Sequence, residues 1–297
     1  MASMFVIKYK TVWYSVSAFL LAASCWAIFY YGFNFSIDFK GGMLTEVRYA
    51  ESRPVQSDLE AEVAALELGG FSLRPSGETS YVVRTRELTS AEKQNLSAVL
   101  DVGQGSQIER QTTIGPTAGA ELQNKASTAI MVVVVMIVLF ITFAFRGVSK
   151  PVSSWKYGLA TIIALVHDVV IPAGLFVYLG YEIDLLFVTG LLAVLGYSVH
   201  DSIVVFDRVR ENLRLNQENN HKEEFELTVG KSVNQTFARS INTSLTIFIT
   251  LFALYLFGAA ITKTFSLLLI VGLIAGTYSS IFVASPLLVT FYKLQKK

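Results

Sequence analysis

Two histidine–aspartate doublets stand in apolar surroundings, where neither residue type is expected. His167 and Asp168 lie at the middle of the third of six apolar stretches, and His200 and Asp201 lie about 7.5 Å from the inner end of the fourth. An ionisable side chain at the centre of a bilayer costs about 2.5 to 3.5 kcal/mol on insertion scales, so each one requires a reason. A carboxylate in this setting can pair with a cation on a neighbouring helix.

A cation and several polar groups open the fifth apolar stretch: Arg239, Asn242, Thr243, Ser244 and Thr246. Because consecutive spans run antiparallel, we expect Arg239 to lie level with Asp201 and to reach toward its carboxylate. Two interpretations of Arg239 stay open. It forms either a helix-pairing salt bridge while snorkelling to the surface, or one half of a functional pair.

The neighbours of Asp201 favour a functional role for its carboxylate. Ser198, His200 and Ser202 give it a polar surround, whereas an apolar side chain at this position would pack the span at less cost. We therefore favour a functional role for Asp201 over a role in helix packing alone.

The doublets do not match a metal centre or an enzyme active site. Adjacent residues of a helix point about 100° apart, so a His-Asp doublet cannot chelate an ion from one face, and no HExxH motif occurs. An intramembrane hydrolase stays open as an alternative, but no serine nucleophile stands at a supporting spacing. We expect no enzyme activity, no metal and no cofactor, and an interhelical hydrogen bond for each histidine.

The elements that must position these residues are membrane spans. Of 297 residues, 53% are hydrophobic and 16% are charged, against roughly 25% charged in soluble proteins. The mean hydropathy is +0.50. A span needs about 20 apolar residues, and six stretches qualify: 14–33, 126–145, 157–179, 185–206, 238–258 and 264–288. The net charge of +1 gives no case for nucleic acid, and the lone Cys25 can form no internal disulfide.

The placement of lysine and arginine predicts the orientation. With the N-terminus in the cytoplasm, only Lys263 lies in the short outer loops. Fourteen basic residues then lie on the cytoplasmic side: Lys8, Lys10, Arg146, Lys150, Lys156, Arg208, Arg210, Arg214, Lys222, Lys231, Arg239, Lys293, Lys296 and Lys297. We therefore expect both termini in the cytoplasm and residues 34–125 outside. The first span is expected to stay as an uncleaved anchor, because its apolar run continues to Tyr30.

Residues 34–125 read as a soluble domain, with thirteen acidic and nine basic side chains. Alternation predicts strands over 43–49, 71–74, 79–86 and 107–114. Helices are expected from Pro54 and after a capping box that Thr89 and Glu92 form. The order β-α-β-β-α-β is that of a ferredoxin-like fold, which hosts many functions and identifies none. The fold class is thus membrane α-helical with one outer α+β domain between the first two spans.

Small residues mark two further features. Asp38, Gly41 and Gly42 lie where the first span meets the outer domain, and form either a turn that glycine permits or a hinge on which the domain swings. Gly272, Gly276 and Ser280 recur at four-residue spacing in the sixth span, which permits close helix packing. Residues 207–237 are expected to form a cytoplasmic loop, with either an interfacial helix or an ordinary loop helix leading into the fifth span.

Four segments together carry a resemblance that covers essentially the whole chain. They are Ile37-Asp38-Phe39-Lys40-Gly41-Gly42, His167-Asp168, the stretch 196–212 (GYSVHDSIVVFDRVREN) and Arg239-Ser240-Ile241-Asn242-Thr243-Ser244. In these segments the chain resembles the SecD/SecF family of bacterial protein-export membrane proteins, on its SecF side. The family usually has Asn before the aspartate of the fourth span, where this chain has His200, which bears on hydration and protonation near Asp201.

The resemblance implies a partner, a mechanism and a set of roles. SecD is the implied partner, in an assembly of the RND superfamily that joins the Sec translocon in the bacterial inner membrane and uses the proton gradient to promote export of unfolded preproteins. By motif match Asp201 carries the proton, Arg239 is its electrostatic partner and Thr243 is a polar neighbour, and Asp168 and His200 complete the expected pathway. The alternative is a small-molecule exporter of the same superfamily, for which residues 34–125 make a small substrate chamber.

Overall fold

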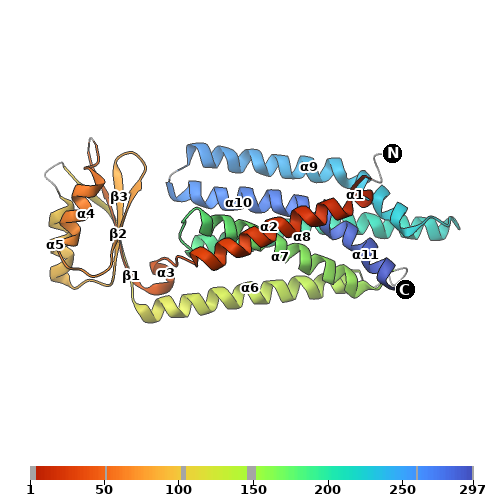
Figure 1. The fold of residues 1–297 in the computed structure, drawn as a ribbon, viewed down its shortest axis with the longest axis horizontal. Helices are drawn as coiled ribbons and strands as arrows, with labels where there is room; N and C mark the ends of the chain where they lie inside the picture. The colour runs from red at the N-terminus through yellow and green to blue at the C-terminus, as the bar shows by residue number, and fades with distance from the viewer. Residues whose placement is uncertain (1–4, 51, 102–104, 146–151, 259, 296–297) are drawn as a thin grey trace.

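The computed structural model describes residues 5–50, 52–101, 105–145, 152–258 and 260–295. Within these ranges it holds a helix bundle and, at one end of the bundle, a four-stranded sheet with its own helices, called here the sheet domain (Figure 1). The bundle thus has a domain end and a far end. Four basic residues used above to predict the orientation lie outside the described residues: Arg146, Lys150, Lys296 and Lys297.

Six helices of the described chain are long and apolar enough to cross a membrane, counting α10 and α11 as one. They are α2 (Lys10–Tyr31), α6 (Pro116–Ala144), α7 (Ser154–Tyr178), α8 (Leu185–Glu218), α9 (Phe225–Phe257) and the continuous pair α10 (Ala260–Ser279) and α11 (Ser285–Gln295). A π-helical turn at Ser280–Ala284 joins α10 to α11, and the short α1 (Phe5–Lys8) precedes α2. Each of the six expected stretches overlaps one of these helices, and four of them extend one or two residues past its end.

Three of the helices run well past the ends of their apolar stretches. α6 begins at Pro116, α8 continues to Glu218 and α9 begins at Phe225, so most of the expected loop 207–237 is helical. A helix satisfies its backbone hydrogen bonds internally and does not have to end where lipid ends. The first turns of α9 bury Phe225, Val229 and Val233 in the far-end core of the bundle, so this segment packs on protein and is not an interfacial helix.

The helices divide into a centre and a periphery. In α7, α8 and α10–α11, 61%, 50% and 67% of the most apolar window is buried, whereas the values for α2, α6 and α9 are 11%, 6% and 11%. α10 packs on both α7 and α8, and α9 packs on α8 and α10. Side chains at the centre are therefore shielded from lipid, and those on the outer faces of α2, α6 and α9 are not.

The sheet domain has the expected order of elements. It comprises β1 (Gly42–Arg48), α4 (Gln56–Ala64), β2 (Ser72–Ser76), β3 (Ser80–Thr85), α5 (Ser90–Leu100) and β4 (Gln107–Ile114). The strands lie in the order β2-β3-β1-β4 and every neighbouring pair is antiparallel. The predicted capping box is confirmed: the Thr89 side chain accepts from the Glu92 backbone N–H, and the Glu92 carboxylate accepts from the Thr89 backbone N–H.

The two faces of this sheet differ because side chains alternate along each strand. Met43, Val47 and Val83 point to the face that α4 and α5 cover, and form the core of the domain. Arg74 and Arg84 stand on the other face, which is turned toward the bundle (Figure 1). A short helix, α3 (Ile37–Lys40), lies between β1 and the bundle and packs on α6.

Candidate functional site

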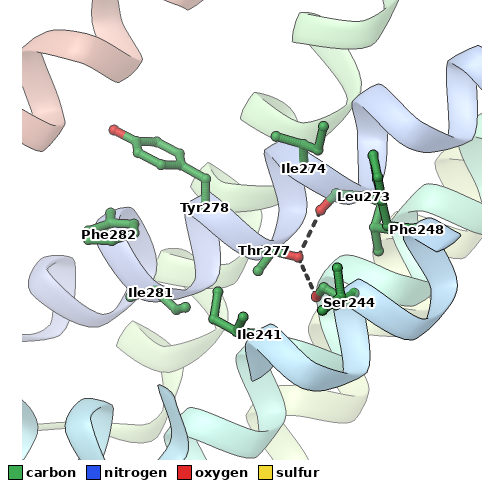
Figure 2. A pocket seen from close by; sticks show the side chains of 10 residues that line it. Ile241, Ser244, Phe248, Leu273, Ile274, Thr277, Tyr278, Ile281 and Phe282 are labelled. Atoms are coloured by element: carbon green, nitrogen blue, oxygen red, sulfur yellow. Dashed lines mark hydrogen bonds between the residues drawn. The ribbon is translucent and has the colours of Figure 1, made fainter. Parts of the chain in front are cut away.

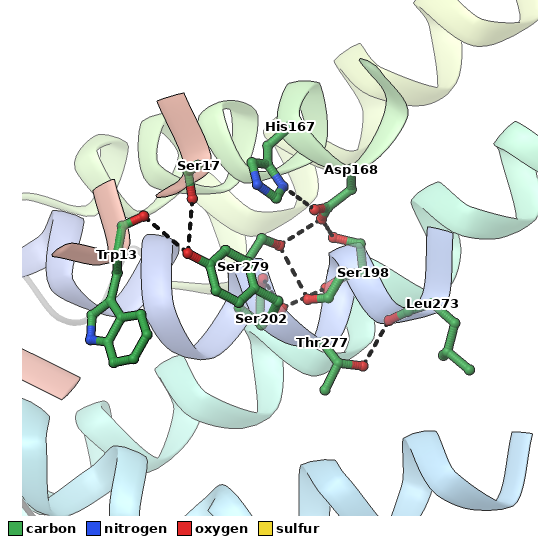
Figure 3. A network of polar contacts seen from close by, with 12 residues as sticks. Trp13, Ser17, His167, Asp168, Ser198, Ser202, Leu273, Thr277 and Ser279 are labelled. Atoms are coloured by element: carbon green, nitrogen blue, oxygen red, sulfur yellow. Dashed lines mark hydrogen bonds and ion pairs between the residues drawn. The ribbon is translucent and has the colours of Figure 1, made fainter. Parts of the chain in front are cut away.

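The first doublet lies at the centre of the bundle and its carboxylate is saturated with donors (Figure 3). Asp168 is fully buried. One carboxylate oxygen, Oδ2, accepts hydrogen bonds from Ser279 Oγ at 2.7 Å and from Ser198 Oγ. The other oxygen lies 2.8 Å from His167 Nδ1. Three donors from α7, α8 and α10 thus converge on one carboxylate, which ties the three central helices together.

His167 is as buried as its neighbour and leaves one polar atom without a partner. Its ring stacks on Tyr278 with centroids 5.8 Å apart, and Nε2 has no hydrogen-bond partner among the described residues. Pro172, four residues after Asp168, has no N–H and cannot bond to the Asp168 carbonyl as an ordinary helical residue would. The middle of α7 therefore places several polar groups in the centre of the bundle.

The second doublet lies at the edge of the centre, where α8 meets α9 and α10. The Asp201 side chain is 8% exposed and that of His200 is 63% exposed, and His200 Nδ1 lies 3.9 Å from Asp201 Oδ1. Ser244 Oγ donates to Asp201 Oδ2 over 3.5 Å and lies 2.6 Å from Thr277 Oγ1. The Thr277 side chain also interacts with the Asp201 carboxylate, so Asp201 is buried with two hydroxyl groups and an imidazole near it.

Arg239 does not reach Asp201 in this structure, contrary to the geometric expectation. Its side chain is exposed on α9 and has no acidic partner among the described residues. Ser244, which does contact Asp201, is five residues further along α9, so Arg239 lies about 140° around the helix and about 7.5 Å along it. Thr243 is half-buried beside Ser244. Arg239 therefore misses Asp201 both along α9 and around it, and its side chain is exposed.

The serines expected around Asp201 bond elsewhere. Ser198 donates to Asp168, and Ser202 Oγ lies 3.0 Å from Ser280 Oγ, which also donates to the Ser198 carbonyl at 3.4 Å. Ser280 begins the π-helical turn, and Ser285 Oγ donates to its carbonyl at 2.8 Å. Residues 279 and 280 therefore face different partners, α7 on one side and α8 on the other. π-helical turns are frequent at functional sites.

The small-residue stripe of α10 lies against α8. A Cβ atom at Gly272 would clash with Val194 Cγ2, and one at Gly276 would lie 3.2 Å from Ser198 Cβ and 3.7 Å from Asp168 Oδ2. Backbone of α10 therefore approaches α8 closely at the level of the Asp168 carboxylate.

A pocket of about 320 Å³ opens between α9 and α10 next to the contacts of Asp201 (Figure 2). Its walls are apolar apart from Ser244, Thr277 and Tyr278, and include Ile241, Leu245, Phe248, Leu273, Ile274, Ile281 and Phe282. The hydroxyl groups of Ser244 and Thr277 lie 2.6 Å apart in its wall (Figure 2). This pocket offers no charged group that would bind a polar substrate.

The Asp38 and glycine segment forms a closely packed junction between the two parts. Asp38 Oδ2 accepts from the backbone N–H of Leu185 at 3.1 Å, at the start of α8. Gly41 and Gly42 have φ of 76° and 133°, and added Cβ atoms would lie 2.8 Å from Pro116 Cα and 2.5 Å from the Thr85 carbonyl oxygen. Both the backbone conformation and the space require glycine here.

Sequence reasoning missed Ser279 and the junction residues Arg84, Arg74 and Glu182. Ser279 precedes Ser280 of the small-residue stripe but is not at the four-residue spacing, so no periodicity singled it out. The junction residues are ordinary charges in strands and a loop, with no motif. No group of three potential metal ligands occurs among the described residues.

Comparison with family models identifies two segments. Residues 94–294 match the model "Protein export membrane protein SecD/SecF, C-terminal", and residues 26–52 match "SecD/SecF GG Motif", which contains Gly41 and Gly42. Among curated relatives, the protein translocase subunit SecF of Thermobaculum terrenum is 38% identical over 306 residues, covering 96% of this chain and 93% of the relative. The SecF subunit of Anaerolinea thermophila is 34% identical over 292 residues, covering 96% and 92%.

Two solved structures of SecDF share the fold. The crystal structure of the translocon-associated membrane protein SecDF from Thermus thermophilus matches with a TM-score of 0.84 and 32% identity over 98% of this chain. SecDF in a super-membrane-facing form matches with a TM-score of 0.68 and 30% identity over 100% of this chain. The chain spans 38% and 39% of those two longer chains. By family model and by relatives along nearly its whole length, the chain belongs to the SecD/SecF family of protein export membrane proteins.

Proposed function

We propose that the chain is an accessory subunit of the Sec protein translocation machinery, which acts with SecD and the Sec translocon and uses the proton motive force to promote preprotein export. The relatives named above are translocase subunits, and the matching SecDF is described as translocon-associated. The six membrane-length helices make it a multi-pass membrane protein, which in a bacterium with this machinery places it in the inner membrane.

The observation that carries the proposal is the environment of Asp201. The Asp201 carboxylate lies inside a membrane bundle, with a hydroxyl contact at 3.5 Å and an imidazole at 3.9 Å. These contacts are too long for a purely structural role to explain why a charged group is buried here. It can exchange partners when α9 moves relative to α8, and proton binding and release require such exchange. One elementary charge crossing about 100 mV releases about 2.3 kcal/mol, which suffices to drive a conformational step.

The remaining pathway residues take supporting roles in this proposal. Arg239 is exposed on a membrane-length helix, and a charged side chain there needs a partner, which the SecD half would supply in the assembled complex. Thr243 and His200 line the approach to Asp201. Asp168 fixes α7, α8 and α10 in the arrangement that holds Asp201 at the edge of the bundle centre, and Gly272, Gly276 and Ser280 permit that packing.

We assign the orientation and the domain type in the same proposal. Residues 34–125 form an extracytoplasmic domain and both termini lie in the cytoplasm, since the basic residues gather at the far end of the bundle. The domain is ferredoxin-like, which the element order β-α-β-β-α-β and the strand order β2-β3-β1-β4 support. Asp38, Gly41 and Gly42 form its base, about which the domain turns.

The test is Asp201→Asn in the complex with SecD and the translocon. Asparagine keeps the shape and the hydrogen-bonding capacity but cannot ionise. We expect export to lose its stimulation by a proton gradient, while insertion and copurification of SecD stay normal. Asp58→Asn, at an exposed position of α4, is the matched control and should export as the wild type does. Full gradient-dependent export by Asp201→Asn at normal expression would remove Asp201 as the proton carrier.

A further inference from the structure

The sheet domain is covalently attached along only one side of its sheet. The chain enters at the start of β1 and leaves at the end of β4, and these two strands are neighbours, with Gly42 paired to Ile114. Both links pass through the packed junction at Gly41 and Pro116. Two links side by side define an axis, and the opposite side of the sheet, formed by β2 and β3, has no covalent link to the bundle.

A set of charged contacts holds that opposite side. Arg84 of β3 forms an ion pair with Glu182, which lies in the connection between α7 and α8. Arg74 of β2 lies 3.9 Å from the same carboxylate oxygen, Glu182 Oε1, and donates from Nη1 to the Gly180 carbonyl at 3.1 Å. These three side chains, Arg74, Arg84 and Glu182, are called the ionic latch below.

Two side chains of the ionic latch are largely buried and incompletely satisfied, whereas Arg74 is 45% exposed. The Glu182 side chain is 10% exposed and that of Arg84 is 24% exposed. Glu182 Oε2 and Arg84 Nε have no hydrogen-bond partner among the described residues. Burial, with Arg74 as a second cause, lowers the pKa of Arg84, while the charges of Asp184 and Asp38 act in the other direction. Desolvation offsets much of the attraction in such a pair, so the contact is specific but not strongly favourable, and it can open.

Glu182 lies three residues before the first residue of α8, and the residues between them are held by hydrogen bonds. The next residue, Ile183, forms a parallel bridge with Phe35, and its N–H donates to the Asn34 carbonyl at 2.9 Å. Asp184 then caps α8, accepting from the Phe187 N–H at 2.7 Å. Glu182 is therefore expected to move with the domain end of α8. The same helix carries Asp201.

We propose that Arg84, Arg74 and Glu182 couple α8 to the orientation of the sheet domain: a shift of α8 at its domain end opens or closes the ionic latch, and the domain turns about the axis at Gly41 and Pro116. The proposal rests on the proposed function, because it takes Asp201 as the residue that displaces α8. Arg84 and Glu182 are positioning residues in this scheme, and they touch neither the proton nor the preprotein.

The experiment measures the domain orientation and export in the same variants. Spin labels at Glu78→Cys in the sheet domain and Lys263→Cys at the start of α10, both exposed positions, report the distance between the two parts in a Cys25→Ala background. Glu182→Gln and Arg84→Gln should each shift the distance distribution of the reconstituted complex away from that of the parent protein. Both should also lower the gradient-dependent stimulation of export toward the level measured without a gradient.

A double-mutant cycle and a matched control separate coupling from general damage. If Arg84 and Glu182 act through each other, the double variant is no worse than either single variant. Arg48→Gln breaks an exposed ion pair with Glu109 inside the same domain, and should change neither readout. Unchanged distances and unchanged export in Glu182→Gln, or additive losses in the double variant, overturn the proposal.

The outcome for Asp201→Asn distinguishes this inference from the proposed function. Loss of stimulation in Asp201→Asn together with normal export in the latch variants rejects the ionic latch alone. Normal stimulation in Asp201→Asn rejects the proton-carrier role, and with it the basis of the coupling.

Discussion

The two His-Asp doublets have the same sequence and lie in consecutive spans, but their surroundings in the fold differ. Asp168 accepts hydrogen bonds from Ser198 and Ser279 and lies 2.8 Å from His167, and both doublet side chains are almost fully buried. Asp201 has contacts at 3.5 Å and 3.9 Å, and its neighbour His200 is 63% exposed. Three directed donors at close distance fix a carboxylate in place, whereas one long hydrogen bond from Ser244 and looser contacts with Thr277 and His200 leave Asp201 able to change partners. We therefore expect the number of close donors around each carboxylate, and not the doublet itself, to distinguish the two sites.

The largest expected contrast is in stability. Asp168→Ala leaves two serine hydroxyls and an imidazole nitrogen buried without their acceptor, and we expect it to lower the free energy of unfolding by about 3 kcal/mol or more. Asp201→Ala removes only long contacts and should cost less than about 1 kcal/mol. Thermal unfolding of the purified protein in detergent measures both. Equal losses would mean that the donor count does not separate the two sites.

Replacing each histidine by asparagine sharpens the comparison. His167→Asn loses a 2.8 Å contact and a stacked ring inside the centre, so we expect a loss of about 1 to 2 kcal/mol in unfolding free energy. His200→Asn, at 3.9 Å from Asp201 and mostly exposed, should change stability by less than about 0.5 kcal/mol and leave export intact. A strong export defect in His200→Asn with normal stability would assign that side chain a direct part in the pathway.

Crowding the Asp168 site from α10 tests whether its packing is required. In Gly276→Ala the added methyl group lies 3.2 Å from Ser198 Cβ, and we expect a loss of about 1 kcal/mol as α10 shifts away from α8. Gly196→Ala on α8 is the control, because a Cβ there meets nothing within 4 Å and alanine favours the helix. The control should be neutral or stabilising. A destabilised control alongside a neutral Gly276→Ala would reverse this reading of the interface.

The smallest expected effect concerns Glu92, a solvent-exposed carboxylate that accepts hydrogen bonds from several protein donors. The Arg86 side chain, followed by the backbone and side chain of Thr89, lowers the pKa of Glu92 to about 2. A lowered pKa stabilises the fold above the pKa of an unfolded glutamate, about 4.3, and that contribution is lost as the pH falls through about 2. Carbon-13 chemical shifts of labelled glutamates measure the titration. An ordinary pKa for Glu92 would contradict the donor rule where it is simplest to observe.

Local pattern was enough to predict the elements of this protein. Three features depend only on residues that are close together in the sequence: the apolar runs of span length, the Thr89 and Glu92 capping box, and the alternation in 43–49. The helix ends were less accessible to sequence reasoning. α8 and α9 continue past the apolar stretches because Phe225, Val229 and Val233 find a core at the far end of the bundle, and hydropathy does not register that packing.

The site was only half accessible to the same reasoning. The cost of burying a charge singled out Asp168 and Asp201, and antiparallel pairing placed Arg239 about 7.5 Å along α9 from the residue that contacts Asp201. Neither consideration gives the rotation of a helix about its axis. In a membrane most sides of a span are apolar, so the sequence pattern does not say which side meets protein.

What the sequence by itself determined is therefore every feature that depends on neighbours in the chain: the number of membrane-length helices, the order of strands and helices, and the presence of charges that need a reason. The tertiary structure alone decided which partner each charge meets. In the fold Arg239 is exposed, Ser198 donates a hydrogen bond to Asp168, and Arg84 forms an ion pair with Glu182. The physical reason is that a hydrogen bond or an ion pair depends on ångström-scale distances between side chains, which only the packing angles and rotations of whole helices and sheets fix.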